Sequence, residues 1–354
     1  MTTVAAVHGV LAPHRYEQGE ITEALAVMCP QQDAERGVLE RLHATSTVGS
    51  RHLALPLDRY RELSGFGQAN DLFIEAGVRL AEQALTGALA AAGLAAEDVD
   101  LVISTSVTGI AAPSLEARLA RRVGLRPDVK RVPVFGLGCV AGAAGLARLH
   151  DYLEGHPGQV AVLLSVELCS LTLQRTDPSV QNMVAGALFG DGAAALVAVG
   201  REHPRCGEFP GPQVVATHSR LYPGTERALG WDIGDSGFKI VLGAELPELV
   251  RLHVGEDVRS FLAEHDLKPP DIAGWVAHPG GPKVLDALAE SLGLPSQALE
   301  LTRRSLARVG NLSSASVLHI LRDTLALRPP PPGTPGLMLA MGPGFCSELV
   351  LLRW

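Results

Sequence analysis

The feature that most constrains the fold is a pattern of elements that occurs twice along the 354 residues. In the first copy, an apolar strand candidate at 99–104 leads through a proline-containing loop and a helix to a Gly-Leu stop. Cys139 then begins a helix of small residues. In the second copy, 272–277 is the strand candidate and Asn311 begins the small-residue helix. Such a duplication packs two similar halves about a pseudo-twofold axis, with the two helix starts facing one centre.

The two copies are linked by a turn-rich segment at 201–212, Arg-Glu-His-Pro-Arg-Cys-Gly-Glu-Phe-Pro-Gly-Pro. Clusters of Gly and Pro mark loops between structured units. We therefore expect an N-terminal half at residues 1–205 and a C-terminal half at residues 206–354.

Composition narrows the class of protein. The chain is 47% hydrophobic with 38 Gly and 4% aromatic residues, which is typical of a packed α/β protein. The formal net charge of -8 argues against nucleic-acid binding. No apolar run approaches the roughly 18 residues that span a membrane, and no signal peptide is recognised. The five cysteines form no C-x-x-C pair, which argues against a zinc site or a disulfide framework and favours a cytoplasmic protein.

Cys139 stands where a glycine-rich turn enters the first small-residue helix, after a predicted buried strand at 131–135. The first turn of a helix carries unpaired N–H groups and a partial positive charge, which stabilise a thiolate. The glycines and alanines nearby leave room for a substrate to approach the sulfur. Cys139 is therefore a candidate nucleophile.

Two other interpretations of this stretch are open. Free cysteines are among the most buried residues, so Cys139 can be a plain core residue. Residues 136–141 also fit the G-x-G-x-x-A pattern of a dinucleotide loop. That loop normally opens the first βαβ unit, with an acidic residue at a strand end about 20 residues on. Here the stretch lies deep in the chain, and Glu154 stands in a polar segment.

Two further residues complete a possible constellation. His278 directly follows a predicted buried strand, in the sequence Ala-His-Pro-Gly-Gly-Pro. The functional residues of α/β proteins usually lie at such carboxyl ends of strands. Taken alone, it can equally be a histidine in a tight turn, and Asn311 can be an ordinary helix N-cap. A cysteine, a histidine and an asparagine that each stand at a helix start or a strand end together favour one shared active site.

Other elements follow from hydrophobic periodicity and stop signals. Residues 31–67 are expected to be polar and irregular. Strands are expected at 3–10, 159–166, 193–199, 213–219, 337–340 and 348–353, and helices at 21–28, 70–92, 114–123, 184–189, 246–264 and 283–292.

Five motifs together resemble those of type III polyketide synthases, the chalcone- and stilbene-synthase-like enzymes of the thiolase superfamily. They are Gly138-Cys139, His278-Pro-Gly-Gly281, Gly310-Asn311-Leu-Ser-Ser314, Leu188-Phe-Gly-Asp-Gly192 and Gly342-Pro-Gly344-Phe345. The resemblance runs from about residue 5 to the C-terminus. It implies a duplicated αβαβα five-layer thiolase-like fold. The chain looks most similar to the bacterial alkylresorcinol and alkylpyrone synthases.

The resemblance also implies a chemistry. Cys139 would take an acyl group from a coenzyme A (CoA) thioester, with His278 as the partner that lowers its pKa. His278 and Asn311 would hold the thioester oxygen of malonyl-CoA while CO2 leaves and an enolate forms. Repeated condensation on an acyl-CoA starter, followed by ring closure, would give a pyrone or a resorcinol. The reaction needs no metal and no redox cofactor.

Further positions match the family's substrate cavity. They are Thr108, Cys169, Thr172, Phe189, Trp231, Ile240, Ser313, Gly342, Pro343 and Gly344. Ile240 and Ala112 are smaller than the residues of the plant enzymes at these positions, which suggests space for a bulky or long acyl chain. Trp231 instead suggests a short pocket or another route for the acyl tail. Arg51 is expected at the CoA entrance. Thr45 replaces a family lysine there, so an acyl-carrier-protein donor stays open.

Two alternatives to this function remain. A β-ketoacyl-acyl-carrier-protein synthase III-like enzyme shares the three residues but makes a single condensation. The chain could also be a silent partner in a heterodimer, which the intact Cys139, His278 and Asn311 oppose. Subunits of this superfamily pair across their sheets, so we expect a homodimer that buries more than roughly 2,000 Å².

Overall fold

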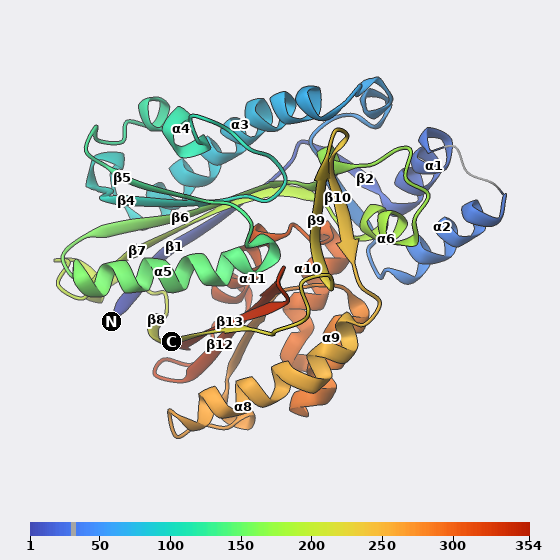
Figure 1. Ribbon diagram of the computed structural model, residues 1–354. Coiled ribbons are helices and arrows are strands. Elements are labelled where there is room, and N and C mark those ends of the chain that lie inside the picture. Colours follow the sequence, from blue (N-terminus) through green and yellow to red (C-terminus); the bar gives the residue numbers. More distant parts are fainter. Residues whose placement is uncertain (30–32) are drawn as a thin grey trace.

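One continuous sheet runs through the computed structural model, which describes residues 1–29 and 33–354 (Figure 1). Within this part of the chain its strand order is β11-β12-β13-β8-β1-β7-β6-β4-β5. The strands are β1 (Thr2–Leu11), β4 (Leu101–Thr105), β5 (Lys130–Val134), β6 (Val160–Leu168), β7 (Asp191–Val199), β8 (Gln213–Leu221), β11 (Gly274–Ala277), β12 (Pro335–Gly342) and β13 (Cys346–Arg353).

The sheet has two arms that repeat the same pairings outward from its centre. In the first arm β1 pairs antiparallel with β7, β7 antiparallel with β6, and β6 parallel with β4. In the second arm β8 pairs antiparallel with β13, β13 antiparallel with β12, and β12 parallel with β11. The arms meet where β1 pairs with β8. This repetition confirms the predicted duplicated fold.

Helices fill three layers around the two arms (Figure 1). Between the arms lie α5 (Ala141–Gly155) and α11 (Ser314–Leu327), the two predicted small-residue helices. The outer face of the first arm is covered by α3 (Phe66–Ala92) and α4 (Leu115–Val123). The second arm is covered by α7 (Leu246–Leu249), a π-helical turn (Val250–Val254), α8 (Gly255–Ala263) and α9 (Pro282–Leu292). The layers are therefore αβαβα, as expected.

The two arms differ at their outer edges. In the first arm, β5 pairs with β4 and ends the sheet. The corresponding part of the second half forms the 3-10 helix η8 (Ser296–Leu299) and α10 (Glu300–Val309) instead of a strand. The prediction that residues 131–135 are buried is wrong. Because β5 has a neighbour on one side alone, its side chains are largely exposed, with Val132 at 45%.

The prediction that residues 31–67 are irregular is also wrong, apart from residues 31 and 32, which lie outside the described part of the chain. This segment contains α2 (Asp33–Thr45), β3 (Ser50–Leu53) and the 3-10 helix η1 (Leu57–Glu62). In α2 the side chains of Leu39 and His43 are buried one turn apart, whereas many of its other residues are polar. The polar composition concealed this helical periodicity.

Several smaller elements enclose one end of the layers. They are β2 (His14–Glu17), which pairs with β3, α1 (Gln18–Met28), the 3-10 helix η4 (Cys169–Thr172), α6 (Val180–Leu188), and the hairpin of β9 (Leu229–Gly234) and β10 (Gly237–Leu242). Three short 3-10 helices lie elsewhere in the described residues: η2 (Ala96–Asp98), η5 (Cys206–Glu208) and η7 (Pro269–Asp271). None of the described helices combines the length and the apolar character needed to cross a membrane.

Candidate active site

Cys139 lies in the 3-10 turn η3 (Gly138–Val140) that leads directly into α5. Gly138 has φ of +58°, and a Cβ there would lie 2.7 Å from the ring of Pro343. Glycine thus lets the chain turn tightly against the second half of the molecule. The Cys139 side chain is buried, and its Sγ donates a 3.6 Å hydrogen bond to Oγ of Ser313. The nucleophile candidate therefore already contacts the second half of the chain.

His278 and Asn311 meet in the same region. His278 follows β11, and its Nε2 lies 3.4 Å from Nδ2 of Asn311, which precedes α11. The side-chain oxygen of Asn311 accepts hydrogen bonds from the backbone N–H of Ser313 (2.8 Å) and from Oγ of Ser316 (3.3 Å). These bonds use the oxygen and leave the amide nitrogen facing the imidazole. Nδ1 of His278 has no partner among the described residues.

Burial opposes a charge on either reactive group taken alone. It raises the pKa of the Cys139 thiol to about 12, although hydrogen bonding of the thiol with Ser313 and Asn311 acts in the opposite direction. Burial also lowers the pKa of His278 to about 3. Proton transfer from the thiol to the imidazole would create both charges together, and each would then stabilise the other.

Glu167, near the end of β6, is a buried carboxylate that the sequence analysis did not select. Its Oε1 accepts hydrogen bonds from Oγ of Ser314 (2.5 Å) and Oγ of Ser313 (3.2 Å), and its Oε2 accepts one from Thr108 (2.9 Å). Burial raises the pKa of Glu167. The signal that could have found it is an acidic residue inside a continuous apolar strand, because a buried carboxylate needs several donors.

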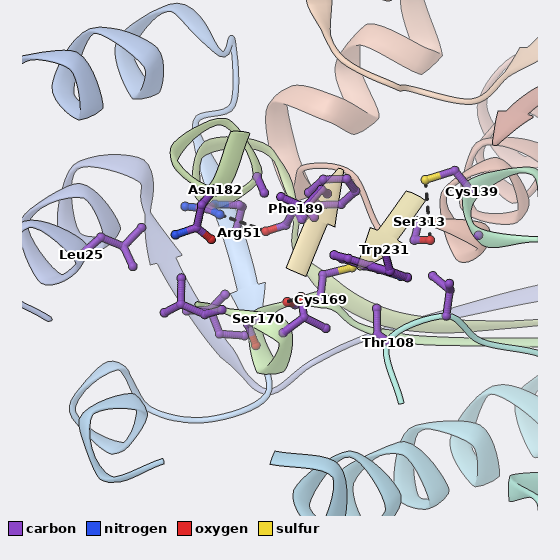
Figure 2. Close-up of a pocket in the computed structure, with 18 of the residues that line it drawn as sticks. Leu25, Arg51, Thr108, Cys139, Cys169, Ser170, Asn182, Phe189, Trp231 and Ser313 are labelled. Atoms are coloured by element: carbon purple, nitrogen blue, oxygen red, sulfur yellow. Dashed lines mark hydrogen bonds between the residues drawn. The ribbon is translucent and has the colours of Figure 1, made fainter. Parts of the chain in front are cut away.

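One cavity begins at Cys139 and Ser313 and extends inward to Asn182 and Leu25 (Figure 2). Eight of the predicted cavity residues line it: Thr108, Cys169, Thr172, Phe189, Trp231, Ile240, Ser313 and Pro343. Gly342 and Gly344 flank Pro343 but are not among the lining residues. The inner walls come from α1 and α6, which the sequence analysis did not connect with the site.

Arg51 lies at the inner part of this cavity, beside Asn182 (Figure 2). Its side chain is 3% exposed, and its Nη1 donates a 2.9 Å hydrogen bond to the carbonyl oxygen of Phe189. This burial was not expected from the sequence, because it is β3 that turns the side chain into the protein. The expected place of Arg51 at the CoA entrance stays a prediction. Thr45, at the end of α2, is exposed.

Comparison with protein families decides the assignment. Sequence models of the N-terminal and C-terminal domains of chalcone and stilbene synthases match residues 2–203 and 213–354. The chain belongs to the chalcone and stilbene synthase family. It is a type III polyketide synthase, a condensing enzyme of the acyltransferase type.

Individual relatives agree with this assignment. The chain is 61% identical, over 100% of its length and 93% of the relative's, to a 1,3,6,8-tetrahydroxynaphthalene synthase of Streptomyces peucetius subsp. caesius. It is 37% identical to a putative chalcone synthase of Bacillus subtilis, over 87% of this chain and 86% of that protein. The crystal structure of the Streptomyces coelicolor 1,3,6,8-tetrahydroxynaphthalene synthase superposes with a TM-score of 0.93 at 29% identity, covering 99% of both chains.

These relatives confirm the predicted thiolase-like fold and the type III polyketide synthase class. They do not favour the single-condensation alternative. The expected closeness to alkylresorcinol and alkylpyrone synthases is not confirmed, since the relative at 61% identity has a different product in its name. The division at residues 205 and 206, the roles of individual site residues and the homodimer stay predictions.

Proposed function

We propose that this type III polyketide synthase builds an aromatic product of the 1,3,6,8-tetrahydroxynaphthalene type from malonyl-CoA. The observation that carries the proposal is the 61% identity, over the whole chain, to the Streptomyces peucetius enzyme of that name. The proposed product has ten ring carbons and four oxygens, which is the alternate-carbon pattern of a five-unit chain after ring closure has removed one oxygen as water. Five two-carbon units joined head to tail give that pattern, so the proposal requires no alkyl or aromatic starter.

The first proposed step loads an acyl group on Cys139. The thiol proton passes to His278, and Sγ attacks the carbonyl carbon of the acyl-CoA thioester. The bond between that carbon and the CoA sulfur then breaks, and the CoA thiolate takes up a proton. Buried surroundings favour this step because they keep water away from the acyl-cysteine.

The second proposed step forms the enolate. His278, with its proton on Nε2, and the Nδ2 amide of Asn311 lie 3.4 Å apart and can donate to one thioester oxygen of malonyl-CoA. As CO2 leaves, its bonding electrons move onto that oxygen, where the two donors stabilise the charge. Removing one such donor typically costs about 3–4 kcal/mol of barrier. The enolate carbon attacks the acyl carbonyl, the bond between that carbon and Sγ of Cys139 breaks, and the thiolate leaves. The chain, now two carbons longer, is a CoA thioester that can load on Cys139 again.

A second candidate product keeps the same chemistry. Leu25 of α1 lies beyond Trp231 as seen from Cys139 (Figure 2), and Ile21 and Met28 of the same helix add to this apolar wall of the cavity. Such a wall favours a long acyl starter, which would end as an alkylpyrone or an alkylresorcinol. The 61% identity outweighs it, because apolar walls are common to most ligand cavities.

We also propose a homodimer, with no metal or redox cofactor in the reaction. The exposed apolar side chains of Val132, Phe135 and Ile110 beside the β5 edge support this pairing, since such residues are usually covered. Sedimentation of the full chain measures the oligomeric state, and a monomer at micromolar concentration would contradict the proposal.

The product is tested by competition between starters. The pure protein is given malonyl-CoA with equal amounts of acyl-CoA esters from acetyl to about sixteen carbons. A longer acyl chain that enters the cavity buries more apolar surface and should compete better. Mass spectrometry should find tetrahydroxynaphthalene as the main product, with the acyl esters largely unused. Tailed pyrones or resorcinols as the main products would overturn the naphthalene assignment and favour the second candidate. A parallel reaction with acyl-carrier-protein thioesters identifies the donor.

A further inference from the structure

Arg51 is a buried cation without a carboxylate in ion-pair distance among the described residues. Its side chain is 3% exposed, and Asp191 is the opposite charge that acts on it most strongly. A guanidinium removed from water is costly unless hydrogen bonds replace the lost hydration. The function of Arg51 should therefore follow from the bonds that it makes.

Two hydrogen bonds of Arg51 tie together segments from distant parts of the chain, and its Nη2 has no partner among the described residues. Nη1 of Arg51 donates to the carbonyl oxygen of Phe189 at 2.9 Å, and Nε donates to Oε1 of Gln18 at 3.1 Å. Gln18 in turn donates through Nε2 to the carbonyl oxygen of Ala187 at 2.9 Å. Arg51 and Gln18 thus hold two backbone carbonyls at the end of α6.

The segment held in this way also fixes the backbone of Asn311. The N–H of Asn311 donates to the carbonyl oxygen of Leu188 at 2.8 Å, and the N–H of Gly190 donates to the carbonyl oxygen of Asn311 at 2.9 Å. Phe189 and Asn311 consequently form a parallel bridge. Both backbone polar groups of Asn311 therefore depend on residues 188–190.

Arg51 contacts the other side of this bridge as well. Gly310 has φ of +72°, and a Cβ there would lie 3.1 Å from Cγ of Arg51 and 2.5 Å from the carbonyl oxygen of Leu188. The aliphatic stem of Arg51 therefore packs on the residue that precedes Asn311. The arginine touches both chain segments whose pairing places the asparagine side chain opposite His278.

We propose that Arg51 is a positioning residue for Asn311 in the decarboxylation of malonyl-CoA. The inference rests on the proposed function, which gives Asn311 a hydrogen bond to the thioester oxygen. A catalytic donor displaced by about 1 Å can lose a hundredfold in rate. Starter loading depends on Asn311 only through the hydrogen bond that helps to lower the pKa of the Cys139 thiol, whereas decarboxylation needs the amide as a donor to the developing enolate. The two steps should therefore respond differently to the loss of Arg51.

The test compares Arg51→Met with Arg322→Met in the full-length protein. Arg322 also donates to a backbone carbonyl, that of Gly9, but its partner lies on β1. For each variant, mass spectrometry follows acylation of Cys139 by an acyl-CoA, and CO2 release follows malonyl-CoA decarboxylation. Arg51→Met should lower kcat of decarboxylation at least tenfold and leave acylation within about threefold, whereas Arg322→Met should change neither by more than about twofold.

A double variant separates positioning from general damage. If Arg51 acts through Asn311, then Arg51→Met combined with Asn311→Ala should decarboxylate no more slowly than Asn311→Ala alone. Multiplied losses, or equal losses in both steps for Arg51→Met, would overturn the inference. An Asn311→Ala variant with unchanged decarboxylation would instead overturn the proposed role of Asn311.

Gln18→Met serves where Arg51→Met does not fold. It removes the acceptor of Arg51 Nε and the donor to Ala187, and it leaves the guanidinium bonded to Phe189. The same selective loss of decarboxylation is expected, about three- to fivefold. A Gln18→Met variant that slows both steps equally would contradict the positioning role.

Discussion

At the scale of single residues, the site depends on groups that burial keeps neutral until they act together. The Cys139 thiol has its pKa raised to about 12, and His278 has its pKa lowered to about 3, in both cases mainly by burial. Neither group is therefore reactive through its own surroundings. We propose that transfer of the thiol proton to His278 supplies the charge and that Asn311 is an uncharged donor, which needs no titration.

Replacing each cavity cysteine in turn shows which of the two carries the acyl group. Cys139→Ala should abolish the acyl adduct, because it removes the proposed nucleophile. Cys169, the other thiol that lines the cavity, is buried and is not expected to take its place. Cys169→Ala, as the matched control, should load within about threefold of the unmodified protein, an effect of side-chain volume alone. Intact-protein mass spectrometry after incubation with acyl-CoA measures both, and an adduct on Cys139→Ala would remove its assignment.

The pH dependence of thiol alkylation tests the pairing. In His278→Ala burial, the charge of Glu167 and nearby hydrogen bonds act on Cys139, so its pKa stays far above the ordinary 9.0 and the thiolate is scarce at neutral pH. Inactivation by iodoacetamide at pH 7 should slow at least tenfold, and it should still be rising at pH 9. Superimposable pH profiles for the variant and the parent would show that His278 does not assist the thiol.

At the scale of elements, the small residues of α5 let the two halves approach closely. A Cβ on Gly142 would collide with the carbonyl oxygen of Ser314, at the start of α11. Cys139 precedes the first of these helices, and Asn311 precedes the second. The close packing of α5 on α11 therefore sets the distance between the reactive groups of the two halves.

Adding one methyl group to this contact should be costly. Gly142→Ala should lower the free energy of unfolding by about 1–3 kcal/mol, the usual effect of overpacking. Gly155→Ala, at the exposed end of the same helix, meets no atom within 4 Å and should be neutral or stabilising by up to about 1 kcal/mol. Urea denaturation compares the two, and equal stability would mean that the interface of α5 and α11 can relax.

At the scale of the whole molecule, the sequence predicted the features that repeat and missed those that do not. The duplicated strands, the two small-residue helices and the meeting of Cys139 with Asn311 follow from patterns local to each half. The hairpin of β9 and β10, the inner cavity wall and the buried position of Arg51 depend on contacts between segments far apart in sequence. The strand β5 was expected but its exposure was missed, because an apolar run in the sequence looks the same in an edge strand as in a core strand.

Buried histidines should make the fold sensitive to acid. The pKa values of His43, His278 and His319 are lowered to about 3, 3 and 4, mainly by burial. Below pH 6.5 the unfolded chain binds protons that the folded chain does not, so stability is lost as pH falls from 6.5 toward 4. Asp191 acts oppositely, because its pKa is raised to about 6 and it takes up a proton first in the folded state.

The net result should be a loss of about 3 kcal/mol in the free energy of unfolding between pH 6.5 and 5. Urea titrations at several pH values measure it. His319→Gln, whose amide can still donate to the carbonyl oxygen of Ala193, should reduce the loss by about 1.5 kcal/mol, which is about half of it. Stability that stays constant over this range would contradict the neutral, buried state of the three imidazoles.

We propose that Cys139 of the first half carries the acyl group, with His278 taking its proton during loading, and that decarboxylation depends on His278 and Asn311 of the second half. Asn311→Ala tests it most directly, with Cys139 acylation and CO2 release from malonyl-CoA followed on the same preparation. Decarboxylation should fall by at least a hundredfold, while loading stays within about threefold. Equal losses in the two steps would contradict the claim.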